Sequence, residues 1–193
     1  MDERGATPVD LLYVRTLGQV GVNGVAVAHG RAVELIAALS LAGGSLSRDW
    51  LLSSLFEQDP SPSSLPTLAM RARKLGVDVV YDSSRCMYHL RDYLTVDVTE
   101  VFAWLKRGRT AEAVAFYQGP FMPRSHSPFA VETRASLENA LVRAVLAEGD
   151  VELMARIDRH VKHPELSERL IACSDDPTTV SLNRSWLKAL DVV

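Results

Sequence analysis

The stretch between residues 25 and 90 constrains the fold more than any other part of this 193-residue chain. Three segments in which apolar residues recur at helical spacing follow one another there: residues 31–42, 47–56 and 63–75. Two short runs rich in β-forming residues come next, 77–81 and 86–90, with a polar tip between them. Three helices followed by a hairpin is the element order of a winged helix-turn-helix, in which the third helix enters a DNA groove and the hairpin forms the wing.

The residues before the first helix predict a small antiparallel sheet. Residues 11–17 are rich in β-formers, and Asn23-Gly24 separates two short apolar runs. Both Asn and Gly tolerate the positive φ angles of a tight hairpin turn, so the pattern predicts three strands in succession. Ser47 has the character of an N-cap for the second helix, and Ser63 or Ser64 that of a cap for the third.

The predicted third helix has two chemically different faces. At about 100° per residue, its apolar residues form one stripe: Leu65, Leu68, Ala69, Ala72 and Leu75. The opposite face carries hydroxyl, thioether and basic side chains, from Ser63, Thr67, Met70, Arg71 and Lys74. Arg73 lies on the flank of this face. No acidic residue occurs between positions 61 and 77. Such a face suits phosphate and guanine contacts, although a helix face that is merely solvated would have the same pattern.

The second half of the sequence is typical of helix pairs. Helical spacing recurs in six segments: residues 99–107, 110–118, 130–148, 151–161, 165–173 and 182–190. Stacked pairs of this kind bury their apolar faces against neighbours, as in tetratricopeptide-like arrays. We therefore predict an α+β winged helix-turn-helix domain over 11–94, after a loose terminus at 1–10. An all-α, tetratricopeptide-like domain over 95–193 would follow it and offer a surface to another protein or a second copy of the chain.

Several motifs in the first half resemble a known family. Asn23-Gly24-Val25-Ala26-Val27, the helix that opens at Gly30-Arg31, and Leu46-Ser47-Arg48-Asp49 resemble the winged helix of the Streptomyces antibiotic regulatory protein (SARP) group. That winged helix is similar to the one in response regulators of the OmpR/PhoB type. The segment from Arg71 to Gly76 resembles the end of the family's recognition helix, and Tyr88-His89-Leu90 resembles the close of its wing.

The resemblance continues into the second half. The segment Tyr117-Gln118-Gly119-Pro120-Phe121-Met122-Pro123, followed by Phe129, Glu132, Arg134 and Leu137, resembles the bacterial transcriptional activator domain (BTAD) of the same regulators, here in a shortened form. Two linked motifs in the family's order are more specific than either alone. The resemblance implies a transcriptional regulator whose partner is double-stranded DNA. Through its helical domain, such a regulator would contact RNA polymerase, another regulator or a second copy of itself.

The resemblance also implies roles for individual residues. The recognition helix, about 63–75, would enter the major groove with the face that begins at Ser63. Thr67, Met70, Arg71 and Lys74 on this face would contact base edges. Phosphates would be held by Arg73 and by the start of the second helix at Ser47 and Arg48, where backbone N–H groups are expected to be free. Arg85 in the wing, about 82–88, would lie over the minor groove.

Composition excludes several other functions. A net charge of −3 argues against a protein that coats nucleic acid non-specifically. No apolar run is long enough for a membrane span, and the first ten residues lack a basic-then-apolar leader, so we expect a cytoplasmic chain with no membrane partner. No catalytic motif is present, and His160, His163 and Cys173 lack a fourth metal ligand; we therefore expect no enzyme, cofactor or metal. The alternative to a DNA-binding regulator is a winged-helix protein-interaction module that no longer binds DNA.

Overall fold

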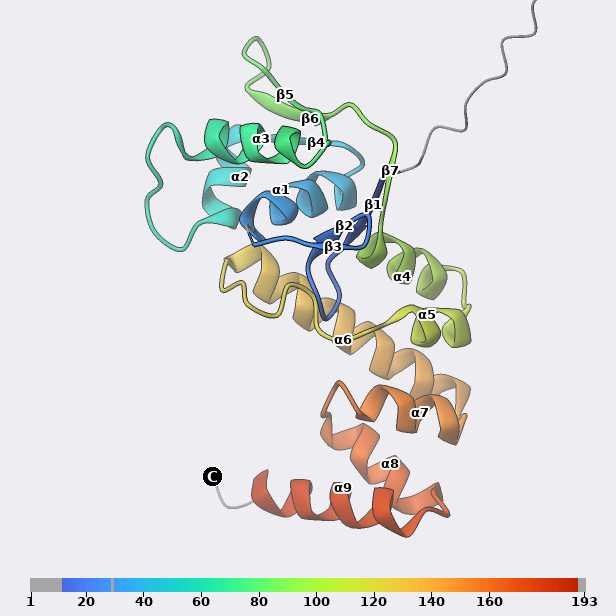
Figure 1. Ribbon diagram of the computed structural model, residues 1–193. Coiled ribbons are helices and arrows are strands. Elements are labelled where there is room, and N and C mark those ends of the chain that lie inside the picture. Colours follow the sequence, from blue (N-terminus) through green and yellow to red (C-terminus); the bar gives the residue numbers. More distant parts are fainter. Residues whose placement is uncertain (1–11, 29, 191–193) are drawn as a thin grey trace, which may run out of the picture.

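The computed structural model describes residues 12–28 and 30–190 and has an α+β fold (Figure 1). The strands and the first three helices form the upper part of the molecule in Figure 1, and the later helices extend below them. An α/β N-terminal part followed by a helical part was predicted, and this coarse division is confirmed. The predicted loose terminus at 1–10 lies outside the described residues.

The N-terminal sheet has four strands in the order β3-β2-β1-β7. These strands are β1 (Leu12–Arg15), β2 (Gly21–Val22), β3 (Val25–Ala26) and β7 (Leu94–Val96). The first three are antiparallel neighbours, as predicted, and Asn23 and Gly24 turn between β2 and β3 with φ angles of 47° and 80°. Strand β7 was not predicted. It pairs in parallel with β1, and the domain boundary predicted at 94/95 falls inside it.

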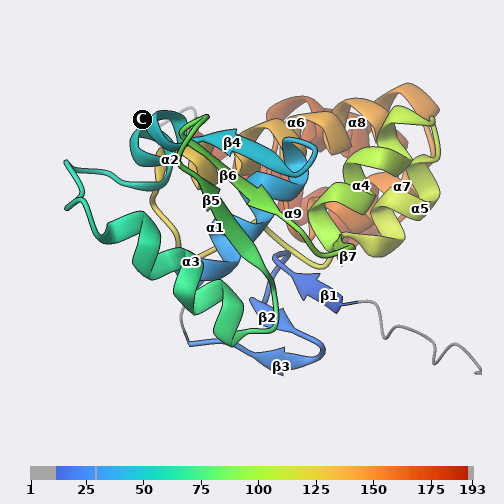
Figure 2. The same cartoon turned by 90° about the horizontal axis from the view of Figure 1, so that it is seen from above.

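Helix α1 (Gly30–Leu41) is the central element of the N-terminal part. Every residue from position 32 to 39 is buried, because α2 (Arg48–Leu55), α3 (Ser64–Lys74), β4 (Ser45–Ser47) and β6 (Met87–Leu90) pack against the helix. Seen from above, α3 lies in front of α1 (Figure 2). The predicted cap of α2 is confirmed: the Ser47 hydroxyl accepts from the Trp50 N–H at 3.2 Å.

The predicted cap of α3 is confirmed in its position but not in its hydrogen bond. Ser63 stands at the N-cap position but has helical backbone angles (φ −86°, ψ −5°), and its side chain makes no capping bond. The Ser64 N–H donates to the Ser61 carbonyl at 2.9 Å, and Pro66, three residues after Ser63, has no N–H that a capping side chain could accept from. The Ser63 hydroxyl lies 3.1 Å from that of Ser61.

A second, antiparallel sheet has the order β4-β6-β5 and packs against α1. The predicted hairpin is confirmed as β5 (Val79–Asp82) and β6 (Met87–Leu90). Strand β4 (Ser45–Ser47) was predicted to be only a link between helices. It pairs with β6, with Ser47 opposite Met87, and so fixes the start of α2 beside the hairpin tip.

Six helices form the rest of the described chain: α4 (Asp97–Lys106), α5 (Thr110–Phe116), α6 (Pro128–Glu148), α7 (Val151–Asp158), α8 (Pro164–Cys173) and α9 (Pro177–Leu190). Each corresponds to a predicted segment, although α9 begins earlier than predicted because Asp176 caps it through the N–H groups of Thr178 and Thr179. Long α6 crosses from beneath α2 to α7 (Figure 1). In the described part of the chain, no helix combines the length and the apolar character that crossing a membrane requires.

Buried hydrogen bonds join the N-terminal part to the helical part. The Asp97 carboxylate at the start of α4 accepts from the backbone N–H of Thr16 at 2.8 Å and of Leu17 at 2.9 Å. The segment before α6 is also bound to the end of β1, since the Met122 N–H donates to the Thr16 carbonyl at 2.8 Å. Arg134 of α6 holds this segment through three of its carbonyl oxygens. The two parts therefore share one continuous core.

Glu34 makes a second connection between the two parts. Its fully buried carboxylate accepts from the hydroxyls of Ser127 and Ser125, the latter at 3.0 Å, and lies 3.8 Å from the Arg31 guanidinium. Ser127 in turn caps α6 by accepting from the Ala130 N–H at 3.1 Å. Burial raises the pKa of Glu34, although the two serines and Arg31 oppose the shift.

The raised pKa of Glu34 gives an expected pH dependence. Between the ordinary and the raised pKa, the folded chain binds this proton more strongly than the unfolded chain does. The Glu34 contribution to the free energy of unfolding therefore falls as pH rises from the ordinary value, about 4.5, through the raised one. We expect the stability of the wild type relative to Glu34→Gln to decline over this interval and then level off. Urea unfolding of both proteins from pH 4 to 8 measures it, and a difference that rises with pH would contradict the assignment.

Candidate nucleic-acid interface

Helix α3 presents the face that the sequence predicted. Leu65, Leu68, Ala69 and Ala72 are buried against α1, α2 and β5. On the other side, Arg71 and Lys74 are exposed, Met70 is 44% exposed and Thr67 is half-buried. The C-terminal helices α7–α9 lie at the opposite end of the molecule (Figure 1), so they do not cover this face.

The cations of α3 form no ion pair with any other residue that the structure describes. Arg71, Arg73 and Lys74 are all exposed in its last turn. Among residues 12–28 and 30–190, no carboxylate lies within ion-pairing distance of any of the three. The Arg73 guanidinium makes only a long bond, 3.4 Å, to the Ala69 carbonyl of its own helix. This end of α3 therefore has a local positive charge that an anionic partner would neutralise.

The start of α2 and the tip of the β5–β6 hairpin form a second group of predicted residues. The Arg48 N–H donates to the Cys86 carbonyl at 2.8 Å, which places Ser47 and Arg48 beside Arg85 of the hairpin tip. The expectation of free N–H groups at the start of α2 is therefore wrong for Arg48, and also for Trp50, whose N–H is taken by Ser47. Pairing of β4 with β6, which was not predicted, directs the Arg48 N–H into the sheet.

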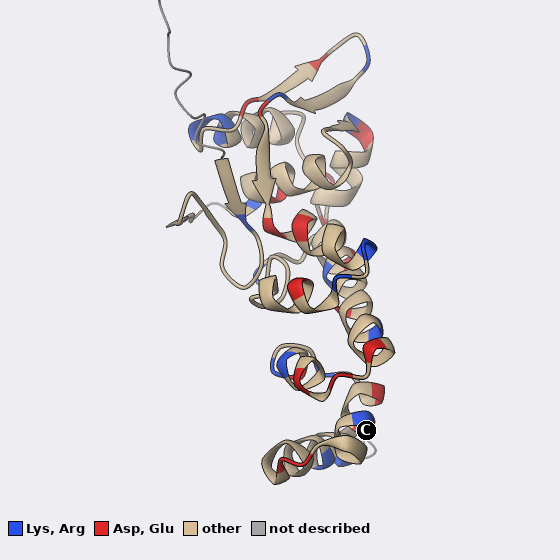
Figure 3. Cartoon of the chain, turned by 90° about the vertical axis from the view of Figure 1, so that its right-hand side faces the viewer, with Lys and Arg blue, Asp and Glu red and all other residues tan. Residues whose placement is uncertain are grey.

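Acidic residues accompany the cations of this second group. Arg48 lies 3.6 Å from the Asp49 carboxylate, and Arg85 lies 4.0 Å from that of Asp82. Figure 3 shows this alternation on the projecting hairpin, with a basic tip and an acidic strand end. The Ser84 hydroxyl donates to the Asp82 carboxylate at 2.6 Å, and this hydrogen bond is the main reason that the pKa of Asp82 is lowered. The Asp82 carboxylate consequently stays negative at neutral pH and offsets Arg85.

Sequence reasoning missed an aromatic pair on the hairpin. The rings of Tyr81 and Tyr88 lie 4.8 Å apart, centroid to centroid. Tyr88 is buried, and burial raises the pKa of its phenol, whereas Tyr81 is 40% exposed. Strand alternation places Tyr81 on the same face as the buried Val79, so it could not have indicated an exposed aromatic ring. Tyr81 adds a flat polar surface near Arg48 that suits contact with a sugar or a base.

The predicted residues thus form two groups rather than one. Thr67, Met70, Arg71, Arg73 and Lys74 share the outer side of α3, and Ser63 is exposed at its first turn. The second group is Ser47, Arg48 and Arg85, at the hairpin tip. Neither group has the chemistry of a metal centre: among the described residues, no three His, Cys, Asp or Glu side chains gather closely enough to hold an ion.

Comparison with known proteins identifies one distant relative. The chain is 33% identical over 129 residues to an uncharacterised 47.3 kDa protein of Rhodococcus erythropolis, described as lying in the thcA 5′ region. The similarity covers 65% of this chain and 28% of the relative, so the chain spans about a quarter of the length of the protein it matches. No protein-family model matches the sequence.

Proposed function

We propose that this chain is a DNA-binding transcriptional regulator of the SARP type. In this proposal residues 11–94 form a winged helix-turn-helix, α3 enters the major groove, and the β5–β6 hairpin is the wing beside the minor groove. Thr67, Met70, Arg71 and Lys74 contact base edges, and Arg73 contacts phosphate. Ser63 adds a hydroxyl donor where α3 begins.

One observation supports this proposal most strongly. The positive end of α3 is exposed and has no neighbouring carboxylate among the described residues, although the chain as a whole has a net charge of −3. A face with hydroxyl, thioether, guanidinium and ammonium groups at positions i, i+3, i+4 and i+7 matches the needs of groove recognition.

The helical part would supply the protein contacts of the regulator. Residues from α4 onward correspond to the proposed shortened BTAD, and α9 at the far end exposes Leu182 by 63% and Leu190 by 46%. Exposed apolar side chains on a terminal helix suit RNA polymerase, another regulator or a second copy as a partner.

Selection from genomic DNA tests the proposed function. The purified full chain would be incubated with sheared fragments of its own genome at about 50 mM salt, and retained fragments would be sequenced and titrated again at about 200 mM salt. We expect enrichment of a few shared sites and a marked loss of affinity at the higher salt concentration. Equal retention of all fragments, or of none, would contradict sequence-specific binding.

Asp82→Asn is expected to strengthen DNA binding by about three- to ten-fold. The asparagine oxygen can still accept from the Ser84 N–H and hydroxyl, so the turn is kept, but the negative charge beside Arg85 is lost. Titration of a selected fragment at low salt measures this effect. Glu132→Gln removes an exposed charge from α6 and serves as the control, for which we expect no change. Unchanged affinity in Asp82→Asn would place the hairpin tip away from DNA.

A protein-interaction module is the second candidate function. The ion pairs of Arg48 with Asp49 and of Arg85 with Asp82 favour it, because they weaken the positive field around the hairpin tip. Exposed Tyr81 and Met70 would then contact an apolar protein surface rather than DNA. The two candidates are separated by the genomic selection, since only the regulator retains specific fragments with a steep salt dependence.

A further inference from the structure

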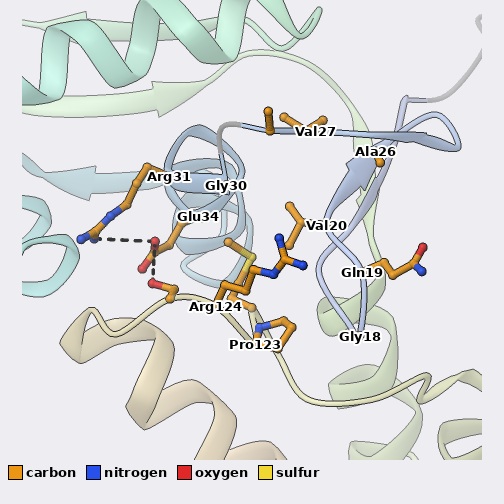
Figure 4. A pocket seen from close by; sticks show the side chains of 13 residues that line it. Gly18, Gln19, Val20, Ala26, Val27, Gly30, Arg31, Glu34, Pro123 and Arg124 are labelled. Atoms are coloured by element: carbon orange, nitrogen blue, oxygen red, sulfur yellow. Dashed lines mark hydrogen bonds and ion pairs between the residues drawn. The ribbon is translucent and has the colours of Figure 1, made fainter.

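A pocket of about 510 Å³ lies where the N-terminal part meets the segment before α6. One wall is formed by the loop that contains Gln19 and Val20, by the end of β3 and by the first turn of α1. The other wall is Met122-Pro123-Arg124-Ser125, as the close-up in Figure 4 shows. This volume is in the range of sites for small molecules, roughly 300–1,000 Å³.

The surface of the pocket is mainly apolar, with one cation, Arg124, that has no ion-pair partner among the described residues. Val20, Val27 and Met122 supply the apolar lining. The Arg124 guanidinium extends toward Val20 between the two walls (Figure 4). Within the part of the chain that the structure describes, no carboxylate lies close enough to pair with Arg124. An apolar cavity with a single available guanidinium favours a ligand that combines an apolar body with an anionic group.

The other charged groups of the pocket are already compensated. The Glu34 carboxylate accepts from Ser127 and Ser125 and pairs with Arg31. Arg31 also donates to the Leu55 carbonyl and lies 3.5 Å from Glu57, on the side away from Arg124 in Figure 4. Neither residue is free to bind a second charged group. Arg124 is therefore the residue that would bind the charged group of a ligand.

We propose that this pocket binds a small organic carboxylic acid, with its carboxylate on Arg124 and its hydrocarbon or aromatic body against Val20, Val27 and Met122. The bound acid holds residues 122–125, which lead directly into α6, against the hairpin of β2 and β3. Through this contact the acid changes the affinity for DNA, a second step that rests on the proposed regulator function. The binding step itself does not.

Calorimetric titration of the full chain tests the binding step. The probes are cinnamate and octanoate, each with its neutral amide as the matched compound. We expect the acids to bind with dissociation constants below about 1 mM and the amides at least about ten-fold more weakly. Arg124→Gln should weaken both acids at least about ten-fold, because it removes the charged donor. Arg184→Gln, an exposed arginine on distant α9, is the control that should bind as the wild type does.

The outcomes separate the pocket from the regulator. Absence of acid binding at about 1 mM, or equal binding by wild type and Arg124→Gln, would overturn the pocket assignment. Thermal unfolding of each variant checks that the fold is kept. If the acids bind, DNA titration in saturating cinnamate should show an affinity change of at least about five-fold. An unchanged DNA affinity would overturn the coupling, whereas failure of all DNA binding would overturn the regulator and leave the calorimetric result standing.

Discussion

Replacing Asp97 by alanine is expected to lower the free energy of unfolding by about 3–5 kcal/mol, the largest effect on stability that we predict. The carboxylate is 3% exposed and accepts from the N–H groups of Thr16, Leu17 and Val98 and from the Thr16 hydroxyl. Alanine leaves these donors buried without an acceptor, and each such group costs about 1–3 kcal/mol. Urea unfolding followed by circular dichroism measures the loss.

Two further variants sharpen this experiment. Asp97→Asn keeps one acceptor oxygen and the side-chain volume, so its loss should be smaller than that of Asp97→Ala but still clear, because an amide N–H₂ then faces a backbone donor. Glu132→Ala removes an exposed carboxylate from α6 and should change stability by no more than about 0.5 kcal/mol. A loss below about 1 kcal/mol in Asp97→Ala would mean that Asp97 does not hold the two parts of the molecule together.

The double variant Arg71→Ala, Lys74→Ala is expected to weaken binding of a selected DNA fragment by about 30- to 1,000-fold. Each good contact of an arginine or a lysine to a base edge is worth about 1–3 kcal/mol, and each cation brought close to the DNA also displaces counterions. The slope of log affinity against log salt should therefore fall by about 1–2 as well. Both side chains are exposed on α3 and their β-carbons are kept, so the fold should be unaffected.

The C-terminal helix provides a matched control for this variant. Arg184→Ala, Lys188→Ala removes the same two residue types at near-identical helical spacing from α9, at the opposite end of the molecule (Figure 1). It should leave both the affinity and its salt slope within experimental error of the wild type. If both double variants lose the same amount of affinity, binding depends on net charge alone and α3 is not the groove-reading element.

The helices and the first hairpin turn of this fold could be predicted because local sequence patterns determine them. The Asn23-Gly24 turn, the Ser47 cap and the apolar stripe of α3 all depend on residues a few positions apart. Strands β4 and β7 are different: Ser45–Ser47 and Leu94–Val96 are three residues each, too short for a periodic signal. Both become strands because a partner distant in sequence, β6 or β1, pairs with them. Such pairing has no local signature.

The candidate site shows the same division. The exposed stripe of α3 follows from helical geometry, and the structure has Met70, Arg71 and Lys74 exposed as the sequence indicated. The ion pair between Arg85 and Asp82 and the loss of a free N–H at Arg48 depend on how the hairpin folds over the start of α2. The pocket at Arg124 could not be predicted at all, because its two walls are about a hundred positions apart in the chain.

The parallel pairing of β1 with β7 has a consequence for how the chain emerges from the ribosome. Leu12 pairs opposite Leu94, so some 80 residues must be synthesised before the first strand meets its second neighbour. Asp97, which binds the end of β1, appears only a few residues later. The nascent N-terminal sheet therefore keeps the β1 edge open until α1, α2, α3 and the hairpin are complete, and β7 then closes it.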